Sequence, residues 1–588
     1  MSELPATGRK RIRLGDLLVE NGMITQQQLD TALAEQKKTG QRLGRSLVDL
    51  GYIDDRALLD FLSRQLQLPF IDLRHYPLQP ELVRRLPETL SRRFRAIVLE
   101  DKDGSYLVGQ ADPTDLFAQD EIARILQRPI RVAVVREADL LAAFDTMFRR
   151  TDEISSIAEQ LGEELAESDI DLARLAQGAD VADAPVVRLL QTLFEDAVQV
   201  RASDIHIEPD EAVLRIRQRI DGVLQEQVMK ERRIASALVS RLKLMAGLNI
   251  SERRLPQDGR FNIRVRERSI DVRLSTMPTI HGESVVMRLL DQSQGILDLD
   301  QIGMPADILK RFRRAIRRPH GMVLVTGPTG SGKTTTLYSA LAELNDPGKK
   351  IITIEDPVEY RLPRINQVQV NFKINLSFAS VLRTALRQDP DVILIGEMRD
   401  QETAEIGLRA AMTGHLVLST LHTNDAVSTA NRLIDMGAPG YLVASSLDAV
   451  LAQRLVRRVC PNCARPHTPD AHERAWLSSM PELSLAEGGH GFRRGAGCMQ
   501  CNNTGYKGRM GVFELLEIDD TLADALRRAD ASAFHREALA RPGFRTLTQN
   551  ALELAARGLT TLEEVVRIGG EIDPEDIEPL VAAVEATA

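Results

Sequence analysis

A glycine-rich stretch, which lies between an apolar run and a helical pattern, constrains the fold of this sequence more than any other feature. The run Met322–Thr326 predicts a buried strand, and the residues from Thr336 onward predict a helix. A tight loop in this position collects backbone N–H groups at a helix N-terminus, where they bind phosphate oxygens. The order of strand, loop and helix is the context that a phosphate-binding loop requires. The predicted nucleotide-binding residues are Gly327, Pro328, Thr329, Gly330, Ser331, Gly332, Lys333, Thr334 and Thr335.

Two side chains of this loop are suited to nucleotide chemistry. Lys333 supplies a point charge for the phosphates, and the hydroxyl of Thr334 is placed to ligate Mg²⁺. The alternative is a glycine-rich turn that contains Lys-Thr by chance. Because the flanking strand and helix are both present, we favour an NTP-binding protein.

Length and composition bound the rest of the chain. A chain of 588 residues is too long for one hydrophobic core, so we expect three or four domains. It shows neither a run of 18 apolar residues nor a signal-peptide pattern, and we expect a cytoplasmic protein without a transmembrane segment. A net charge of −9 and 4% aromatic residues argue against an extended nucleic-acid surface, although locally basic faces remain possible.

Residues 1–68 contain a tandem repeat. The segment Arg13–Ile24 is matched by Arg42–Ile53, and each unit predicts a short helix, a glycine turn and a longer helix. A shared apolar face accounts for the leucines and glycines, but not for Arg-Leu-Gly at both starts and Gln at both ends. The pattern resembles the MshEN domain, whose ligand in that family is cyclic di-GMP; a purely structural helical repeat is the alternative. The resemblance implies ligand contacts from Arg13, Leu14, Gly15, Gln36, Arg42, Leu43, Gly44 and Gln65.

Three regions follow before the glycine-rich loop. Residues 69–150 alternate strand-like and helical runs and predict a small α/β part of the N-terminal domain. Residues 151–184 are acidic and lack aromatic side chains, which indicates a helical or partly disordered linker. Residues 185–293 begin with an amphipathic helix and continue as alternating strands rich in arginine. These arginines form either a solvated face or a surface that acts on phosphates.

Acidic residues end two predicted strands beyond the loop. The first strand ends at Glu355, and the second is followed by Glu397. The carboxyl ends of parallel strands share the edge at which an open α/β sheet binds its ligand. A third strand is flanked by His415 and His422, for which we predict γ-phosphate sensing or coupling, although a histidine satisfied within the core is the alternative.

The glycine-rich loop, the two acidic strand ends and the strand with two histidines resemble, in order, the sequence boxes of the type II secretion and type IV pilus ATPases. Together with the repeat, they make the chain most similar to MSHA-type pilus-extension ATPases. The resemblance implies an α/β multidomain protein in which a PAS-like domain precedes a RecA-like P-loop core at residues 294–588. It further implies a homo-hexamer that hydrolyses ATP with Mg²⁺, with Glu355 as catalytic base and Glu397 organising Mg²⁺ through its water shell. The second acidic box ends in Gly-Glu in place of aspartate, which leaves this division of labour open. Phosphate-facing arginines implied by the family are Arg217, Arg260, Arg273 and Arg288.

Four cysteines lie in two Cys-x-x-Cys pairs within residues 455–510. This spacing predicts a structural Zn²⁺ site in which protein ligands fill all four positions. Two redox dithiols are the alternative. Secretion ATPases have a similar insertion, and the resemblance implies that it docks to an inner-membrane platform protein. The predicted ligands are Cys460, Cys463, Cys498 and Cys501.

The sequence therefore predicts an ATPase that extends a type IV pilus or assembles a pseudopilus, with cyclic di-GMP as its regulator. We expect it in the cytoplasm, peripherally bound to the inner membrane through the platform. A DNA-uptake or DNA-transport NTPase of the same superfamily is one alternative, which the acidic charge and low aromatic content disfavour. A nucleotide-regulated binding module with little turnover is another, which the pair of acids disfavours.

Overall fold

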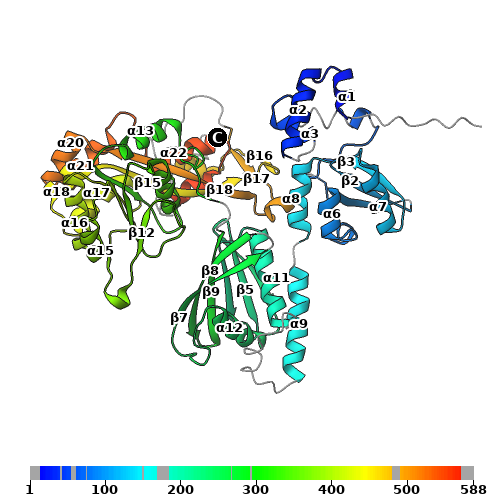
Figure 1. Ribbon diagram of the computed structural model, residues 1–588, viewed down its shortest axis with the longest axis horizontal. Coiled ribbons are helices and arrows are strands. Elements are labelled where there is room, and N and C mark those ends of the chain that lie inside the picture. The colour runs from blue at the N-terminus through cyan, green and yellow to red at the C-terminus, as the bar shows by residue number, and fades with distance from the viewer. Residues whose placement is uncertain are drawn as a thin grey trace, which may run out of the picture. The chain divides into compact units, whose positions relative to one another are not determined.

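The computed structural model divides the chain into two compact units, Met1–Arg149 and Arg150–Ala588 (Figure 1). It describes residues 14–39, 43–53, 61, 63–65, 67–74, 76–102, 104–148, 151–167, 185–265, 268–291, 295–479 and 491–570. Within these residues, no helix has the length and apolar character that crossing a bilayer requires.

The first unit joins helices to a small sheet, as the sequence predicts. Strand β2 pairs antiparallel with β1 and parallel with β3. The repeat has the expected turns, since Gly22 and Gly51 both adopt positive φ, at 68° and 70°, a conformation that favours glycine. The elements are α1 (Leu14–Glu20), α2 (Gln26–Thr39), α3 (Leu43–Asp49), α5 (Pro80–Val83), α6 (Glu88–Phe94), β1 (Ala96–Lys102), β2 (Ser105–Gln110), α7 (Leu116–Leu126), β3 (Ile130–Val134) and α8 (Glu137–Met147).

The second unit begins with a domain built on a six-stranded antiparallel sheet of order β6-β5-β4-β9-β8-β7. Side chains alternate along β5, so that Arg215, Arg217 and Arg219 share the half-exposed face, as expected from period two. The elements are α9 (Thr151–Glu167), α11 (Pro185–Gln199), β4 (Asp204–Pro209), β5 (Leu214–Ile220), β6 (Val223–Met229), α12 (Ile234–Met245), β7 (Gln257–Val265), β8 (Arg268–Thr279) and β9 (Gly282–Asp291).

Helix α9 occupies the first half of residues 151–184, for which the sequence predicts a helical or partly disordered linker. Its buried residues Ile154, Ile157, Ala158 and Leu161 recur at helical spacing and join the same core as α11. The acidic composition describes the opposite, solvated face of an amphipathic helix. The first half of the expected linker is therefore part of the arginine-rich domain, and residues 168–184 lie outside the described residues.

The nucleotide domain is built on a seven-stranded sheet of order β12-β11-β13-β14-β10-β15-β18. All neighbouring strands are parallel except β15 and β18. Successive residues of β10 enter opposite cores, with Met322 and Leu324 on one face and Val323 and Val325 on the other. A strand covered on both faces is typical of parallel sheets, as the apolar run predicts.

This domain contains the following helices and strands. They are α13 (Ala306–Ile316), β10 (Gly321–Thr326), α14 (Lys333–Leu344), β11 (Ile351–Glu355), β12 (Asn366–Gln369), η2 (Phe372–Ile374), α15 (Phe378–Ala385), β13 (Val392–Ile395), α16 (Gln401–Met412), β14 (Leu416–Leu421), α17 (Ala426–Asp435), α18 (Gly440–Ser446), β15 (Leu447–Val459), β16 (Ala464–Pro466), α19 (Ala471–Ser478), β17 (Arg493–Gly495), η3 (Met499–Cys501), β18 (Tyr506–Glu517), α20 (Asp520–Arg527), α21 (Ala531–Leu539), α22 (Leu547–Ala556) and α23 (Leu562–Gly569).

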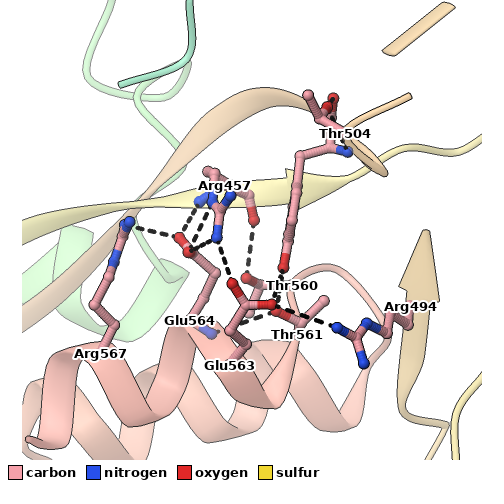
Figure 2. Close-up of polar contacts among 9 residues, drawn as sticks. Arg457, Arg494, Thr504, Thr560, Thr561, Glu563, Glu564 and Arg567 are labelled. Atoms are coloured by element: carbon pink, nitrogen blue, oxygen red, sulfur yellow. Dashed lines mark hydrogen bonds and ion pairs between the residues drawn. The ribbon is translucent and has the colours of Figure 1, made fainter. Parts of the chain in front are cut away.

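The carboxyl end of β15 is held by the last described helix, α23 (Figure 2). The guanidinium of Arg457 donates to the fully buried carboxylate of Glu564 at 2.8 Å, and also to Glu563 at 2.8 Å. Arg567 donates to Glu564 from the other side at 2.9 Å. These ion pairs fix the C-terminal helix to the strand that ends immediately before Cys460.

Candidate functional site

The glycine-rich loop joins the end of β10 to the start of α14. Helix α14 begins at Lys333, directly after Gly332, so its unpaired N–H groups face the loop. The ammonium of Lys333 donates to the carbonyls of Gly327 at 2.7 Å and Pro328 at 3.1 Å. Burial lowers the pKa of Lys333, and the negative charge of Glu397 opposes that shift. The strand, loop and helix thus follow in the predicted order, and the lysine is folded back onto loop carbonyls.

The loop is also supported by Gln453 of β15, which the sequence analysis missed. Its amide donates to the carbonyl of Ser331 at 2.8 Å and its oxygen accepts from the Thr336 hydroxyl at 2.7 Å. A Cβ at Gly332, where φ is 91°, would lie 2.7 Å from the Gln453 amide nitrogen. This contact joins residues more than a hundred positions apart in the sequence, and no local sequence pattern predicts it.

Glu355 is the last residue of β11 and is 4% exposed. Its carboxylate oxygen Oε2 accepts a hydrogen bond from the hydroxyl of Tyr338 on α14. The other oxygen, Oε1, accepts from the Thr353 hydroxyl and from the Gln367 amide, the latter at 3.2 Å. All three donors are neutral groups.

Glu397 follows β13, the neighbouring strand, and is held by a guanidinium and an imidazole. The guanidinium of Arg399 lies 2.6 Å from Oε1, and the imidazole of His422 lies 3.4 Å from Oε2. Because β11, β13, β14 and β10 are parallel, both acids and the loop share the carboxyl edge of the sheet. This placement of the two acids at one edge agrees with the strand arrangement that the sequence predicts.

The two histidines lie at opposite ends of β14. His422 follows the strand and reaches Glu397, whereas His415 precedes it. The carbonyl of His415 accepts from the N–H of Gly321 at the start of β10, and its Nδ1 lies 3.0 Å from the carbonyl of Ala410. Of the two, His422 therefore lies at the edge of the sheet that carries Glu397, and His415 lies at the other edge, since a six-residue strand separates its ends by roughly 20 Å. A role of either histidine in γ-phosphate sensing or coupling stays a prediction.

The predicted phosphate-facing arginines are all paired with carboxylates. Arg217 lies 2.6 Å from Glu208, Arg288 lies 3.2 Å from Asp204, and Arg260 lies 2.5 Å from Asp271. Arg273 differs, since it reaches out of its own sheet to Glu359, four residues beyond Glu355. The carboxylates compete with any phosphate for these guanidinium groups.

The four cysteines converge as their spacing predicts. Their sulfur atoms all lie within 4.8 Å of one another, at 3.8 Å for Cys460 and Cys498, 3.8 Å for Cys463 and Cys501, and 3.6 Å for Cys498 and Cys501. Four Zn–S bonds of about 2.3 Å in a tetrahedron separate their sulfurs by about 3.8 Å. The backbone N–H groups of Cys498 and Gly505 point at the Cys501 sulfur. The donor set and spacing fit a tetrahedral metal.

The N-terminal candidates are described only in part, because Arg13 and Arg42 lie outside the described residues. Leu14 and Gly15 begin α1, Leu43 and Gly44 begin α3, and Gln36 lies on α2. The amide of Gln65 donates to the side chain of Asn21 at 3.4 Å, which joins the end of one repeat to the turn of the other. A Cβ at Gly15 would lie 2.5 Å from the side chain of Leu29, so helix packing alone accounts for that glycine.

Residues 179–567 match the family model described as type II/IV secretion system protein. The match takes in the arginine-rich domain, the nucleotide loop, both acids and all four cysteines. The chain belongs to this family. A second model, the MshEN domain, matches residues 66–154 and so lies on the α/β part that follows the repeat.

Similar proteins carry related names. The type IV pilus assembly ATPase PilB of Myxococcus xanthus is 44% identical over 561 residues, covering 94% of this chain and 98% of the relative. The type II secretion system ATPase E of Vibrio cholerae is 42% identical over 504 residues, covering 84% and 98%. The solved structure of the pilus retraction motor PilT with bound ADP is 26% identical, covers 66% of this chain and 99% of that one, and has a TM-score of 0.45. The chain is thus an ATPase of the type IV pilus and type II secretion family.

Proposed function

We propose that this chain is the Mg²⁺-dependent motor that extends an MSHA-like type IV pilus or assembles a type II pseudopilus. The observation that carries the proposal is the convergence of Lys333, Glu355 and Glu397 on one edge of a parallel sheet. The loop binds the phosphates and Lys333 turns from the loop carbonyls toward them. Thr334 ligates the Mg²⁺ of the nucleotide.

The two acids take different roles. Glu355 accepts a proton from the attacking water, because its neutral donors leave its negative charge unopposed by any adjacent cation that the structure describes. Glu397 orients the water shell of Mg²⁺, and Arg399 and His422 hold it in place. His422 couples the state of Glu397 to β14, the strand that His422 directly follows.

The working form is a homo-hexamer in which the arginine-rich domain acts on nucleotide. Arg217, Arg260, Arg273 and Arg288 exchange their present carboxylate partners for phosphate oxygens, within one subunit or between neighbours. A guanidinium bonds carboxylate and phosphate with the same planar fork, so this exchange needs no new geometry. Each hydrolysis step then moves this domain against the nucleotide domain.

The N-terminal unit regulates the motor by binding cyclic di-GMP. The proposal draws on the MshEN match and on the repeated Arg-Leu-Gly and Gln of the tandem units. The cysteine cluster holds Zn²⁺, which keeps the insertion folded for docking on the inner-membrane platform protein. The protein is thereby held at the cytoplasmic face of that membrane.

Substitution of the proposed base tests the catalytic assignment. Glu355→Gln keeps the size of the side chain but removes its basicity, and we expect turnover to fall on the order of 10²–10⁴-fold while ATP binding is retained. The matched control is Glu343→Gln on α14, whose carboxylate pairs with Arg313 and Arg317. Unchanged turnover in Glu355→Gln would show that another group takes the proton.

Calorimetric titration of the full-length chain tests the regulator. We expect cyclic di-GMP to bind wild type and to bind Arg13→Ala at least about tenfold more weakly, since a guanidinium that pairs with phosphate contributes more than a neutral hydrogen bond. Arg11→Ala removes the same charge two positions away and serves as the control. Equal affinity in all three proteins, or no binding to wild type, contradicts the regulatory assignment.

Metal analysis tests the cysteine cluster. We expect one zinc per chain in wild type and loss of bound zinc in Cys498→Ser, because structural sites need all four ligands. Two redox dithiols would instead give no bound zinc and a disulfide content that follows the applied potential.

A further inference from the structure

Tyr338 makes a hydrogen bond that catalysis by Glu355 can use. It lies on α14, five residues after Lys333, and the residue is 2% exposed. Its hydroxyl donates to Glu355 Oε2. Among the described residues this is the donor on Oε2, whereas Oε1 accepts from Thr353 and Gln367.

The direction of the Tyr338 proton is fixed by a second contact. The backbone N–H of Glu359 donates to the Tyr338 oxygen at 3.3 Å. A phenol has one proton, and with an acceptor position filled by this N–H the proton is directed to the carboxylate. Burial, together with the nearby charge of Glu355, raises the pKa of Tyr338, which keeps the phenol protonated at neutral pH.

The same backbone segment is anchored by the arginine-rich domain. The carboxylate of Glu359 pairs with the guanidinium of Arg273, whose Nη1 lies 3.1 Å from Oε1. A continuous set of contacts therefore runs from Arg273 through Glu359 and Tyr338 to Glu355. It joins a residue of the preceding domain to the acid at the end of β11.

We propose that Tyr338 is the positioning residue of the catalytic carboxylate and that the Arg273–Glu359 ion pair sets its position. The proposal rests on the assignment of Glu355 as the base. Each carboxylate oxygen has two lone pairs, so the bond from Tyr338 leaves Oε2 one lone pair to take the proton of the attacking water. The hydroxide oxygen bonds to the γ-phosphorus as the bond to the ADP oxygen breaks. When Arg273 leaves Glu359 for another partner, the segment that orients Tyr338 loses its anchor.

Tyr338→Phe tests this role because it removes one oxygen and keeps the buried ring. We expect kcat to fall about tenfold, the effect of one hydrogen bond at the reacting group, with KM for ATP changed by less than about twofold. The acidic limb of the pH–rate profile should move to higher pH, because each donor stabilises the charged form of a carboxylate. A purely structural role would leave that profile unmoved.

Tyr360→Phe is the matched control. Tyr360 packs edge-on against Tyr338, with ring centroids 6.2 Å apart, and is partly buried. Removal of its hydroxyl takes no donor from Glu355, so we expect wild-type kcat and pH profile. Both proteins are compared with wild type in thermal midpoint and in ATP binding.

Two further variants keep the outcomes distinct. In a Glu355→Gln background, adding Tyr338→Phe should change kcat by less than about twofold, since both act on one step. Glu359→Gln should lower kcat in wild type but not in Tyr338→Phe, and it serves in place of Tyr338→Phe if that protein does not fold. Full turnover in Glu355→Gln would contradict the assignment of Glu355 as the base. Loss of turnover in Glu355→Gln, with wild-type kcat and pH profile in Tyr338→Phe, overturns the positioning role alone.

Discussion

Two regions of the nucleotide domain each contain two buried carboxylates. In both regions the two carboxylates differ in the kind of group that holds them. At the nucleotide edge, Glu355 is held by neutral donors and Glu397 by Arg399 and His422. Near the C-terminal helices, Glu514 is held by backbone N–H groups and Glu564 by Arg457 and Arg567. A carboxylate beside cations keeps its charge, whereas one among neutral donors can accept a proton.

Each region thus has one acid beside a guanidinium and one acid with neutral donors only among the described residues, and we call the second the proton-accepting acid. At the nucleotide edge, in the mechanism proposed above, Glu355 takes the proton of the attacking water and Glu397 organises Mg²⁺. Away from that edge the same difference affects only stability, because Glu514 and Glu564 join helices to strands. The effects of substituting the four acids should therefore depend more on the type of partner that each acid has than on its distance from the ATP site.

The largest expected effect belongs to Glu564→Ala. Its carboxylate is fully buried between Arg457 and Arg567 (Figure 2), and removal of one member of a buried ion pair costs about 3–5 kcal/mol. Urea unfolding followed by the single tryptophan, Trp476, measures this cost, since Trp476 is buried and its indole donates to the carbonyl of Gly570 just after α23.

Glu563→Ala is the matched control for that loss. Glu563 also contacts Arg457, but its side chain is 54% exposed. Exposed ion pairs contribute at most about 1 kcal/mol. Equal losses of unfolding free energy in the two variants would show that burial of the carboxylate does not determine its contribution. The contrast would then fail for stability.

Glu397→Gln should produce the next largest effect. Loss of a group that acts on a metal through its water shell costs about 10–100-fold in metal affinity or activity. We therefore expect a lower kcat and a higher Mg²⁺ concentration for half-maximal turnover. The Mg²⁺ dependence separates this variant from Glu355→Gln, which should lose turnover at every Mg²⁺ concentration.

Glu402→Gln is a suitable control on the helix that follows. Its side chain is 57% exposed and pairs with Arg383. We expect unchanged Mg²⁺ dependence. If Glu397→Gln gave the same Mg²⁺ dependence as wild type and Glu355→Gln shifted it, the roles of the two acids would be exchanged.

Local motifs allowed much of this architecture to be predicted from sequence. The glycine-rich loop, the acid that ends β11, the acid that follows β13 and the cysteine pairs can each be recognised from a few neighbouring residues. Parallel strands then bring their carboxyl ends together without further information. The same reasoning placed β1, β2 and β3, because apolar runs bounded by turns fix strands of that length.

Contacts between distant segments could not be predicted in this way. Gln453 supports the loop from a strand that lies 122 positions after Ser331 in the sequence, and its sequence neighbours give no sign of this contact. Tyr338 has the spacing of a core residue of α14, and only its partner on β11 gives its hydroxyl a role. The order of His415 and His422 about one strand could be predicted, but the partners that they contact, Ala410 and Glu397, could not.

The smallest expected effect tests the proton-accepting acid of the second region. Glu514 on β18 accepts from the N–H of Ala426 at 2.7 Å and of Leu547 at 2.8 Å, which begin α17 and α22. Burial raises the pKa of Glu514 from 4.5 to about 7, with a smaller contribution from Asp425. The folded state therefore binds this proton more tightly than the unfolded chain does. Its stabilising contribution is fully present below about pH 4.5 and is lost as the pH rises through 7.

Wild type should consequently lose about 1.4 kcal/mol more stability than Glu514→Gln between pH 6 and pH 8. Trp476 fluorescence during urea unfolding at the two pH values gives the four free energies, and groups common to both proteins cancel. Glu517→Gln on the same strand, where the carboxylate pairs with Arg311, should follow the wild-type pH dependence. A Glu514→Gln protein that also followed it would mean that the backbone donors keep Glu514 charged, and the contrast with Glu564 would then rest on the cations alone.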